Sequence, residues 1–268
     1  MAESVDINLV TLCYAMIIVT SLELAALMHL VLEESSHASR TLTPFNILMG
    51  IGNLGLIAHW VGELLSQVFR GTTTGLAGSM VSSACFNLCL YAYIHYVYVR
   101  SEDVISSLFS QVAKWGRMFL ALSIAVFVTN TVAQGLETFV SSIKIQAFYV
   151  NHITGLLGGF MTVSFDLFCM ICYCRLMLKT RHDDKIDPHF LIIARYGAVS
   201  SLFGVFGFAV AVISAFLFPG LHMLMNVFMA LGYTTLLAMK FALHRQRLKK
   251  THDYRTKSWV SKSALSAA

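Results

Sequence analysis

Residues 190–217 read FLIIARYGAVSSLFGVFGFAVAVISAFL and carry one charged side chain, Arg195. A helix needs about 20 predominantly apolar residues to cross the hydrocarbon core of a bilayer. This stretch is longer than that, and no proline interrupts it. We therefore expect a transmembrane helix over 190–217, and the same test applies to the rest of the chain.

The composition as a whole is typical of a membrane protein. Hydrophobic residues make up 57% of the 268 residues and charged residues 12%, and the mean hydropathy is +0.70, well outside the range of soluble domains. Charge clusters separate seven apolar runs. We predict an all-α polytopic membrane protein, a seven-transmembrane-helix bundle with helices at about 8–32, 44–69, 75–99, 114–135, 147–178, 190–217 and 220–243.

The basic residues predict how this bundle lies in the membrane. Cytoplasmic loops of membrane proteins are enriched in Lys and Arg. If the N-terminus is outside, only Arg70 and Lys144 of the 19 lysines and arginines fall on the outer side. We therefore expect an integral membrane protein of the plasma membrane or an endomembrane, with its N-terminus outside and its C-terminus in the cytoplasm.

A basic segment, HRQRLKKTHDYRTKSWVSKSALSAA at 244–268, follows the last expected helix. The sequence thus divides into a transmembrane domain, 1–243, and a basic cytoplasmic tail, 244–268. The tail and the charged connection at 179–189 favour anionic inner-leaflet headgroups and a cytosolic signalling protein as partners. They do not favour nucleic acid.

Polar residues inside the expected helices are the best indication of a site, because such groups are costly in a membrane and usually face the bundle interior. In the helix at 44–69 they share a stripe with glycines, which mark closely packed faces. The same holds at 147–178. We predict an outer-half cavity that binds a small-molecule ligand or ion through His59, Glu63, His152, His222 and Asn226.

A second set of polar residues, Glu23, Asp166 and Arg195, lies nearer the centre or the inner half. Arg195 is deep enough in its helix to neutralise a buried carboxylate, and Asp166 is on the preceding helix. We expect these two residues to form a buried ion pair within a buried charge network that also includes Glu23. The tyrosine-rich segment YAYIHYVYV, 91–99, is interpreted as an interfacial aromatic belt.

The layout of seven helices, with long helices five and six, a basic third inner loop and a basic tail, resembles that of G-protein-coupled receptors. Arg100, in YVRSED, lies near where such receptors carry an acidic-Arg-aromatic motif, although the order of residues differs. The N-P-x-x-Y and C-W-x-P motifs are absent. The resemblance implies a receptor that binds a small ligand in the outer half and signals through its cytoplasmic loops.

Three other classes stay open. A small-solute transporter of two three-helix repeats around a linker helix also has seven spans, and Asn87 and Asn226 occupy comparable places in helices three and seven. A zinc-dependent membrane hydrolase needs several His ligands. A di-haem protein would use His pairs at matched depth, namely His59 with His152 or His222, and His29 with His95. No motif specifies a cofactor or a metal, and an enzyme is the less favoured reading.

Overall fold

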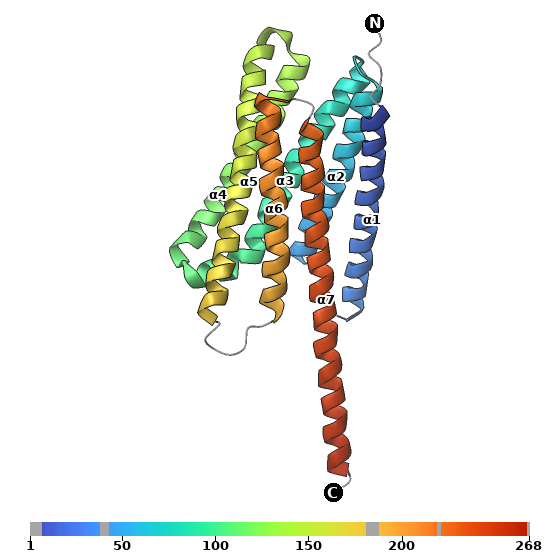
Figure 1. Cartoon of the computed structure of the whole chain (residues 1–268), viewed down its shortest axis with the longest axis vertical. Helices are drawn as coiled ribbons and strands as arrows, with labels where there is room; N and C mark the ends of the chain where they lie inside the picture. The colour runs from blue at the N-terminus through green and yellow to red at the C-terminus, as the bar shows by residue number, and fades with distance from the viewer. Residues whose placement is uncertain (1–6, 38–42, 181–187, 219–220, 267–268) are drawn as a thin grey trace.

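The computed structural model describes the backbone of residues 7–37, 43–180, 188–218 and 221–266, and within them it is all α-helical (Figure 1). Seven of its helices are long and apolar enough to cross a membrane in this described part of the chain. A short 3₁₀ turn, η1 (Ser141–Ile143), precedes the fifth. The seven are α1 (Ile7–His37), α2 (Pro44–Val68), α3 (Thr73–Leu108), α4 (Ser110–Phe139), α5 (Lys144–Thr180), α6 (Pro188–Phe216) and α7 (His222–Ser266).

Two helix starts follow from local sequence. Thr43 precedes Pro44, which needs no hydrogen-bond acceptor at the first helical position, and the Thr43 hydroxyl accepts from the Asn46 N–H at 3.3 Å. Thr72 caps α3 in the same way, because its hydroxyl accepts from the Gly75 N–H at 3.2 Å. Both starts lie within two residues of their predicted positions.

Two helices extend furthest beyond their predicted bounds. The predicted helix at 75–99 continues to Leu108, and α4 begins at Ser110, so that the expected inner loop between them is almost absent. The last helix continues to Ser266 through the segment expected to be a tail. The reason is that an apolar run marks the part of a helix inside hydrocarbon, whereas backbone hydrogen bonding continues into water without it.

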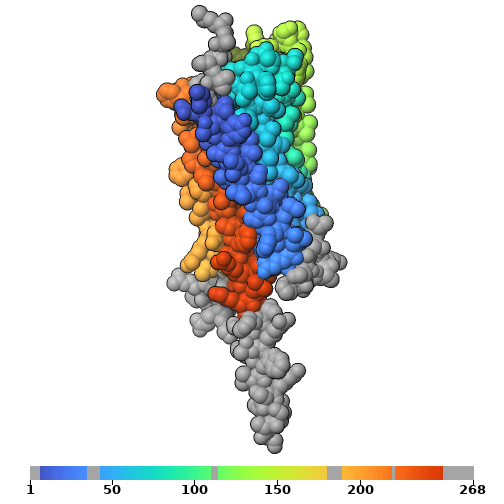
Figure 2. All heavy atoms as spheres, turned by 90° about the vertical axis from the view of Figure 1, so that its right-hand side faces the viewer, coloured from blue at the N-terminus to red at the C-terminus, as the bar shows by residue number. Residues whose placement is uncertain are grey.

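The helices alternate in direction, so each connection lies at one of two ends (Figure 1). We call the half where α1 begins and α7 enters the N-side half, and the half where α7 leaves the bundle the C-side half. On the face shown in Figure 2, α1 lies beside α7. Its side chains Ile18, Leu22 and Leu32 are exposed, as expected for a surface that faces lipid.

The backbones of α2 and α3 approach each other closely in the N-side half. A Cβ on Gly62 would lie 2.7 Å from the Gly78 carbonyl oxygen, and one on Gly78 would lie 2.8 Å from the Gly62 carbonyl oxygen. Neither glycine can be enlarged unless the backbones separate. The glycine stripe on α2 is therefore a packing face, as its sequence predicted.

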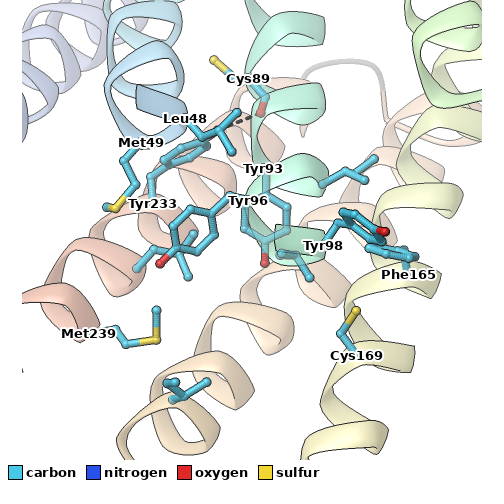
Figure 3. Close-up of a cluster of buried hydrophobic side chains, with 14 of the residues drawn as sticks. Leu48, Met49, Cys89, Tyr93, Tyr96, Tyr98, Phe165, Cys169, Tyr233 and Met239 are labelled. Carbon is cyan, nitrogen blue, oxygen red and sulfur yellow. Dashed lines mark hydrogen bonds between the residues drawn. The ribbon is translucent and has the colours of Figure 1, made fainter. Parts of the chain in front are cut away.

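The C-side half contains a core rich in tyrosine (Figure 3). Tyr93, Tyr96 and Tyr98 of α3 are each 5% exposed, so the expectation of an aromatic belt at 91–99 is wrong for these three side chains. Tyr233 of α7 donates to the Cys89 carbonyl at 2.7 Å. A buried tyrosine usually finds a partner for its hydroxyl group, as Tyr93 and Tyr233 do here.

Candidate ligand-binding cavity

A cavity of about 750 Å³ lies between α2, α3, α4, α5, α6 and α7. Its lining residues come from the N-side portion of each helix. The structure brings the five side chains of the predicted site to the wall of this one cavity, namely His59, Glu63, His152, His222 and Asn226. Their capacity to bind a ligand stays a prediction.

One wall is built around His59 of α2, Glu63 one turn later, and Ser82 of α3. The Ser82 hydroxyl donates to Glu63 Oε1 at 2.6 Å. His59 Nδ1 lies 2.9 Å from the same hydroxyl oxygen and 3.1 Å from the Ser82 carbonyl oxygen. The close contact at Gly62 and Gly78 is what brings Ser82 within reach of both α2 side chains.

This cluster does not have the order of a hydrolase triad. In a triad the carboxylate orients the imidazole, and the imidazole accepts the proton of the serine hydroxyl. Here the carboxylate of Glu63 accepts the hydroxyl proton directly. The Ser82 residue is also 2% exposed, so its oxygen is poorly placed to attack a substrate.

The opposite wall is a ladder of side-chain amides from α3, α4 and α5. Asn87 Nδ2 donates to Asn130 Oδ1 at 2.9 Å, and Asn130 Nδ2 donates to Asn151 Oδ1 at 2.9 Å. Asn151 Nδ2 donates in turn to Gln134 Oε1 and, at 2.9 Å, to Glu137 Oε2. The ladder is absent from the sequence-based site, although its signal was present: four amide residues recur within otherwise apolar runs.

Aromatic rings cover much of the remaining wall. The Phe86 ring centroid lies 5.2 Å from that of His59, and the Phe148 centroid lies 4.1 Å from that of His152. Phe203 and Phe208 of α6 also line the cavity. The site therefore combines a few directed polar groups with a large apolar surface, which is the usual composition of a small-molecule pocket.

The C-side end of the cavity, which we call the floor, contains Tyr93 and Ser200. They are the lining residues furthest into the C-side half on α3 and α6. Their hydroxyl oxygens lie 3.0 Å apart. Tyr93 also donates to Asp166 Oδ2 at 2.7 Å, and Ser201 donates to the same oxygen at 2.7 Å. The floor is thus hydrogen-bonded to a buried carboxylate beneath it.

Asp166 faces Arg100 of α3. Arg100 Nη2 lies 3.9 Å from Asp166 Oδ1, and both side chains are 4% exposed. The guanidinium also lies over the rings of Tyr96 and Tyr173, at 5.9 and 5.7 Å from their centroids. Tyr173 donates to the Arg100 carbonyl at 2.6 Å. The charge of Arg100 is therefore balanced by one carboxylate and two aromatic faces.

The predicted pairing of Asp166 with Arg195 is wrong. Arg195 is exposed, and the residue of α6 that faces the guanidinium is Gly197, where a Cβ would lie 3.6 Å from Arg100 Nη2. Sequence reasoning placed Arg100 in a loop because it ended the helix at 99. Once α3 is extended to Leu108, Arg100 lies within a helix and points into the bundle.

Glu23 does not join this ion pair. It lies on α1 and accepts from the Thr234 hydroxyl of α7 at 2.5 Å. Nearer the C-side end of the same two helices, Lys240 Nζ lies 3.0 Å from Glu34 Oε2. The charged side chains are therefore divided between one pair that joins α3 to α5 and a second set of contacts that joins α1 to α7. A single network was expected.

The described part of the chain contains no group of three or more His, Cys, Asp or Glu side chains that could hold a metal ion. Of the residues considered for haem, His29 is exposed on α1, and His59 already contacts Ser82. No model of a known protein family, no curated protein and no solved structure matches this chain.

Proposed function

We propose that this protein is a receptor-like membrane protein that binds a small ligand in the cavity and transmits the binding to its C-side end. One observation carries the proposal. Tyr93 lines the cavity and donates a hydrogen bond at 2.7 Å to Asp166, the carboxylate that faces Arg100. A ligand at the floor thus lies one hydrogen bond from a buried ion pair.

The coupling works through competition for one hydrogen bond. A ligand that accepts from the Tyr93 hydroxyl removes a donor from Asp166, whose other described donor is Ser201. Arg100 also contacts α7, where its Nη1 lies 3.9 Å from Met239 Sδ. A changed balance at Asp166 therefore acts on α3, α5 and α7 together. The ligand shifts this equilibrium only by its difference in affinity between the two states.

The proposal needs the N-side half to face outward. The distribution of Lys and Arg in the sequence supports this orientation. The test uses cysteines introduced at positions 3 and 258 in a background without the native cysteines. An impermeant thiol reagent should label the first from outside intact cells and the second only after permeabilisation. Labelling of both positions from one side contradicts the orientation and the receptor with it.

The C-side end is where we place the cytosolic partner. Arg245 and Arg247 lie on α7 beyond the ion pair of Lys240 with Glu34. α5 ends and α6 begins at the same end (Figure 1), and 181–187 lie outside the described residues. Basic residues there attract anionic lipid headgroups or an acidic protein surface. The partners are thus expected at the end where Arg100 is buried.

Transmission can be tested with a fluorophore on Cys174. This residue is exposed near the C-side end of α5, whereas Cys13, Cys89, Cys169 and Cys172 are buried. An environment-sensitive maleimide on Cys174, in a Cys85→Ala background, should change its emission when a compound enters the cavity. The compounds are small amines, alcohols and carboxylates with one shared apolar body, and Cys174→Ser gives the background.

The decisive variant is Tyr93→Phe, which keeps the ring and removes the hydroxyl. It should abolish the emission change at Cys174 and leave binding within about threefold, because it removes one neutral hydrogen bond. Binding is measured separately by the fluorescence of Trp60, which packs beside His59, with Trp115 and Trp259 replaced by Phe. An unchanged response at Cys174 in Tyr93→Phe contradicts the proposed route.

A transporter is the second candidate, and the closed C-side half favours it. A polar cavity near one end, sealed beneath by a buried ion pair, is also what a transporter with access from one side requires. Uptake of a bound compound into proteoliposomes separates the two functions. A receptor binds without net flux, whereas a transporter accumulates the compound inside.

A further inference from the structure

The cavity wall is biased towards one kind of ligand charge. Among the described residues that line it, Glu63 is the one carboxylate, and no lysine or arginine is present. Three histidines, His59, His152 and His222, share the wall. A ligand with a negative charge would lie near Glu63 without a permanent cation to balance it. The wall therefore favours a neutral or positively charged ligand.

The hydrogen bonds around Ser82 fix the state of His59. The hydroxyl has one hydrogen, and Glu63 accepts it at 2.6 Å. His59 Nδ1 faces two oxygen atoms of Ser82, which now act as acceptors. Nδ1 must therefore carry a hydrogen, and in the neutral ring Nε2 is a bare acceptor. His59 is 3% exposed, and its Nε2 has no hydrogen-bond partner among the described residues.

Asn226 presents a second acceptor from α7. Its Nδ2 lies 3.8 Å from Met223 Sδ. The amide nitrogen therefore donates to the sulfur, and the amide oxygen points away from Met223. Asn226 Oδ1 has no partner within the described chain, and the residue is 3% exposed. Buried polar atoms are nearly always paired. Two orphaned acceptors on one cavity wall thus indicate that a donor belongs there.

We infer that the cavity takes a ligand with a protonated amine on a compact apolar body. This inference rests on the proposed function, because it names the ligand of that same cavity. The ammonium group supplies several N–H donors, which matches the two acceptors and the carboxylate of Glu63. The ring of Phe86 beside His59 adds a face that attracts a cation. The apolar body packs against Phe148, Phe203 and Phe208.

The test compares four head groups on identical bodies. The set consists of 2-phenylethylamine, its N-trimethyl ammonium analogue, 2-phenylethanol and 3-phenylpropionate, with cyclohexyl versions of each. Binding is measured by Trp60 fluorescence. Amines should bind about tenfold more tightly than the alcohols and carboxylates. The amines should also bind more tightly than the trimethyl compounds, which keep the positive charge and have no N–H donor.

Two carboxylates at the same end of the bundle give a matched pair of variants. Glu63→Gln should weaken amine binding about tenfold or more and leave alcohol binding unchanged. Glu137→Gln should change amine binding by less than about twofold, because Glu137 does not itself line the cavity and a glutamine oxygen can still accept from Asn151. His59→Gln, which keeps a polar side chain of similar size, should also weaken amine binding.

Each outcome decides between the inference and the proposed function. If no amine binds at about 1 mM, or if carboxylates bind more tightly, the inference is wrong. If carboxylates bind and still change the emission of the fluorophore on Cys174, the receptor proposal stands and the inference of an amine ligand fails. If amines bind as expected and no bound compound changes that emission, the inference stands and the receptor proposal fails.

Discussion

The two halves of the bundle use polar side chains in opposite ways. In the N-side half, polar groups line a cavity of about 750 Å³. In the C-side half, Arg100 and Asp166 face each other inside a tyrosine-rich core, and a cavity of about 660 Å³ there, between α3, α4 and α5, is lined by apolar side chains. A polar residue in a membrane helix can therefore indicate either a binding site or a structural contact between helices, and burial alone does not distinguish the two.

The difference originates in side-chain size along the same helices. From residue 75 to residue 85, α3 reads GLAGSMVSSAC, and from 91 to 99 it reads YAYIHYVYV. Small side chains leave room once the backbones are in contact, as at Gly78, whereas the tyrosines fill the space between helices. The cavity ends at Tyr93, where the second pattern begins.

The largest effect should come from breaking the ion pair in the C-side half. Asp166→Asn leaves the enclosed Arg100 charge without its carboxylate and should lower the free energy of unfolding by about 3 to 5 kcal/mol. The double variant Asp166→Asn with Arg100→Gln should recover much of that loss. Denaturant unfolding of the purified protein in micelles measures both.

Arg195→Gln is the matched control, because Arg195 is exposed on the adjacent helix. It should change the free energy of unfolding by less than about 0.5 kcal/mol. Losses that add in the Asp166 and Arg100 double variant would show that the two residues are not a pair. The C-side half would then accept an unpaired charge, as the cavity in the N-side half accepts that of Glu63.

An intermediate effect is expected where α2 meets α3. Gly62→Ala places a Cβ 2.7 Å from two backbone atoms of α3 and should cost about 1 to 3 kcal/mol of unfolding free energy. It should also weaken amine binding, because it moves Ser82 away from His59. Gly50→Ala is the control, since nothing lies within 4 Å of its Cβ position. Equal stability of the two variants would rule out the close approach.

The smallest effect should come from the amide ladder in the N-side half. Asn130→Ala removes the residue that joins Asn87 to Asn151, and it should cost about 0.6 to 2 kcal/mol. The loss is smaller than at Asp166 because the remaining amides border a cavity that water can enter. Thr235→Ala, an exposed site that bonds only within α7, is the control. A loss above that of Asp166→Asn would reverse the comparison between the halves.

The sequence predicts the bundle well because hydrophobicity reports directly on the membrane. Helical phase and glycine position also predict that His59, Glu63 and His222 reach one cavity. Neither hydrophobicity nor helical phase predicts where α3 and α7 end, because a helix can continue into water with ordinary polar residues. Arg100 was therefore missed as the partner of Asp166, and the pairing was assigned to the nearest basic residue that lay inside an apolar run.

Uncharged polar residues are harder to interpret from one sequence. An asparagine in a membrane helix can form a hydrogen bond wherever it faces another helix. The recurrence of amides at Asn130 and Asn151 therefore does not by itself distinguish a cavity wall from ordinary helix packing. Tyr93 is likewise indistinguishable by sequence from the other tyrosines of α3. Its role depends on the distance from its hydroxyl to Asp166, which only the packing of α3 against α5 determines.

The most direct measurement compares two cysteines on α3 in micelles, where both ends of the bundle meet solvent. Ser83 lines the cavity, and Ser101 is 0% exposed beside Arg100. In a parent with Cys85 and Cys174 replaced by Ala, Ser83→Cys should react readily with a charged methanethiosulfonate reagent, and Ser101→Cys should react at least about a hundredfold more slowly. Equal reaction rates would contradict an open N-side cavity above a closed C-side half.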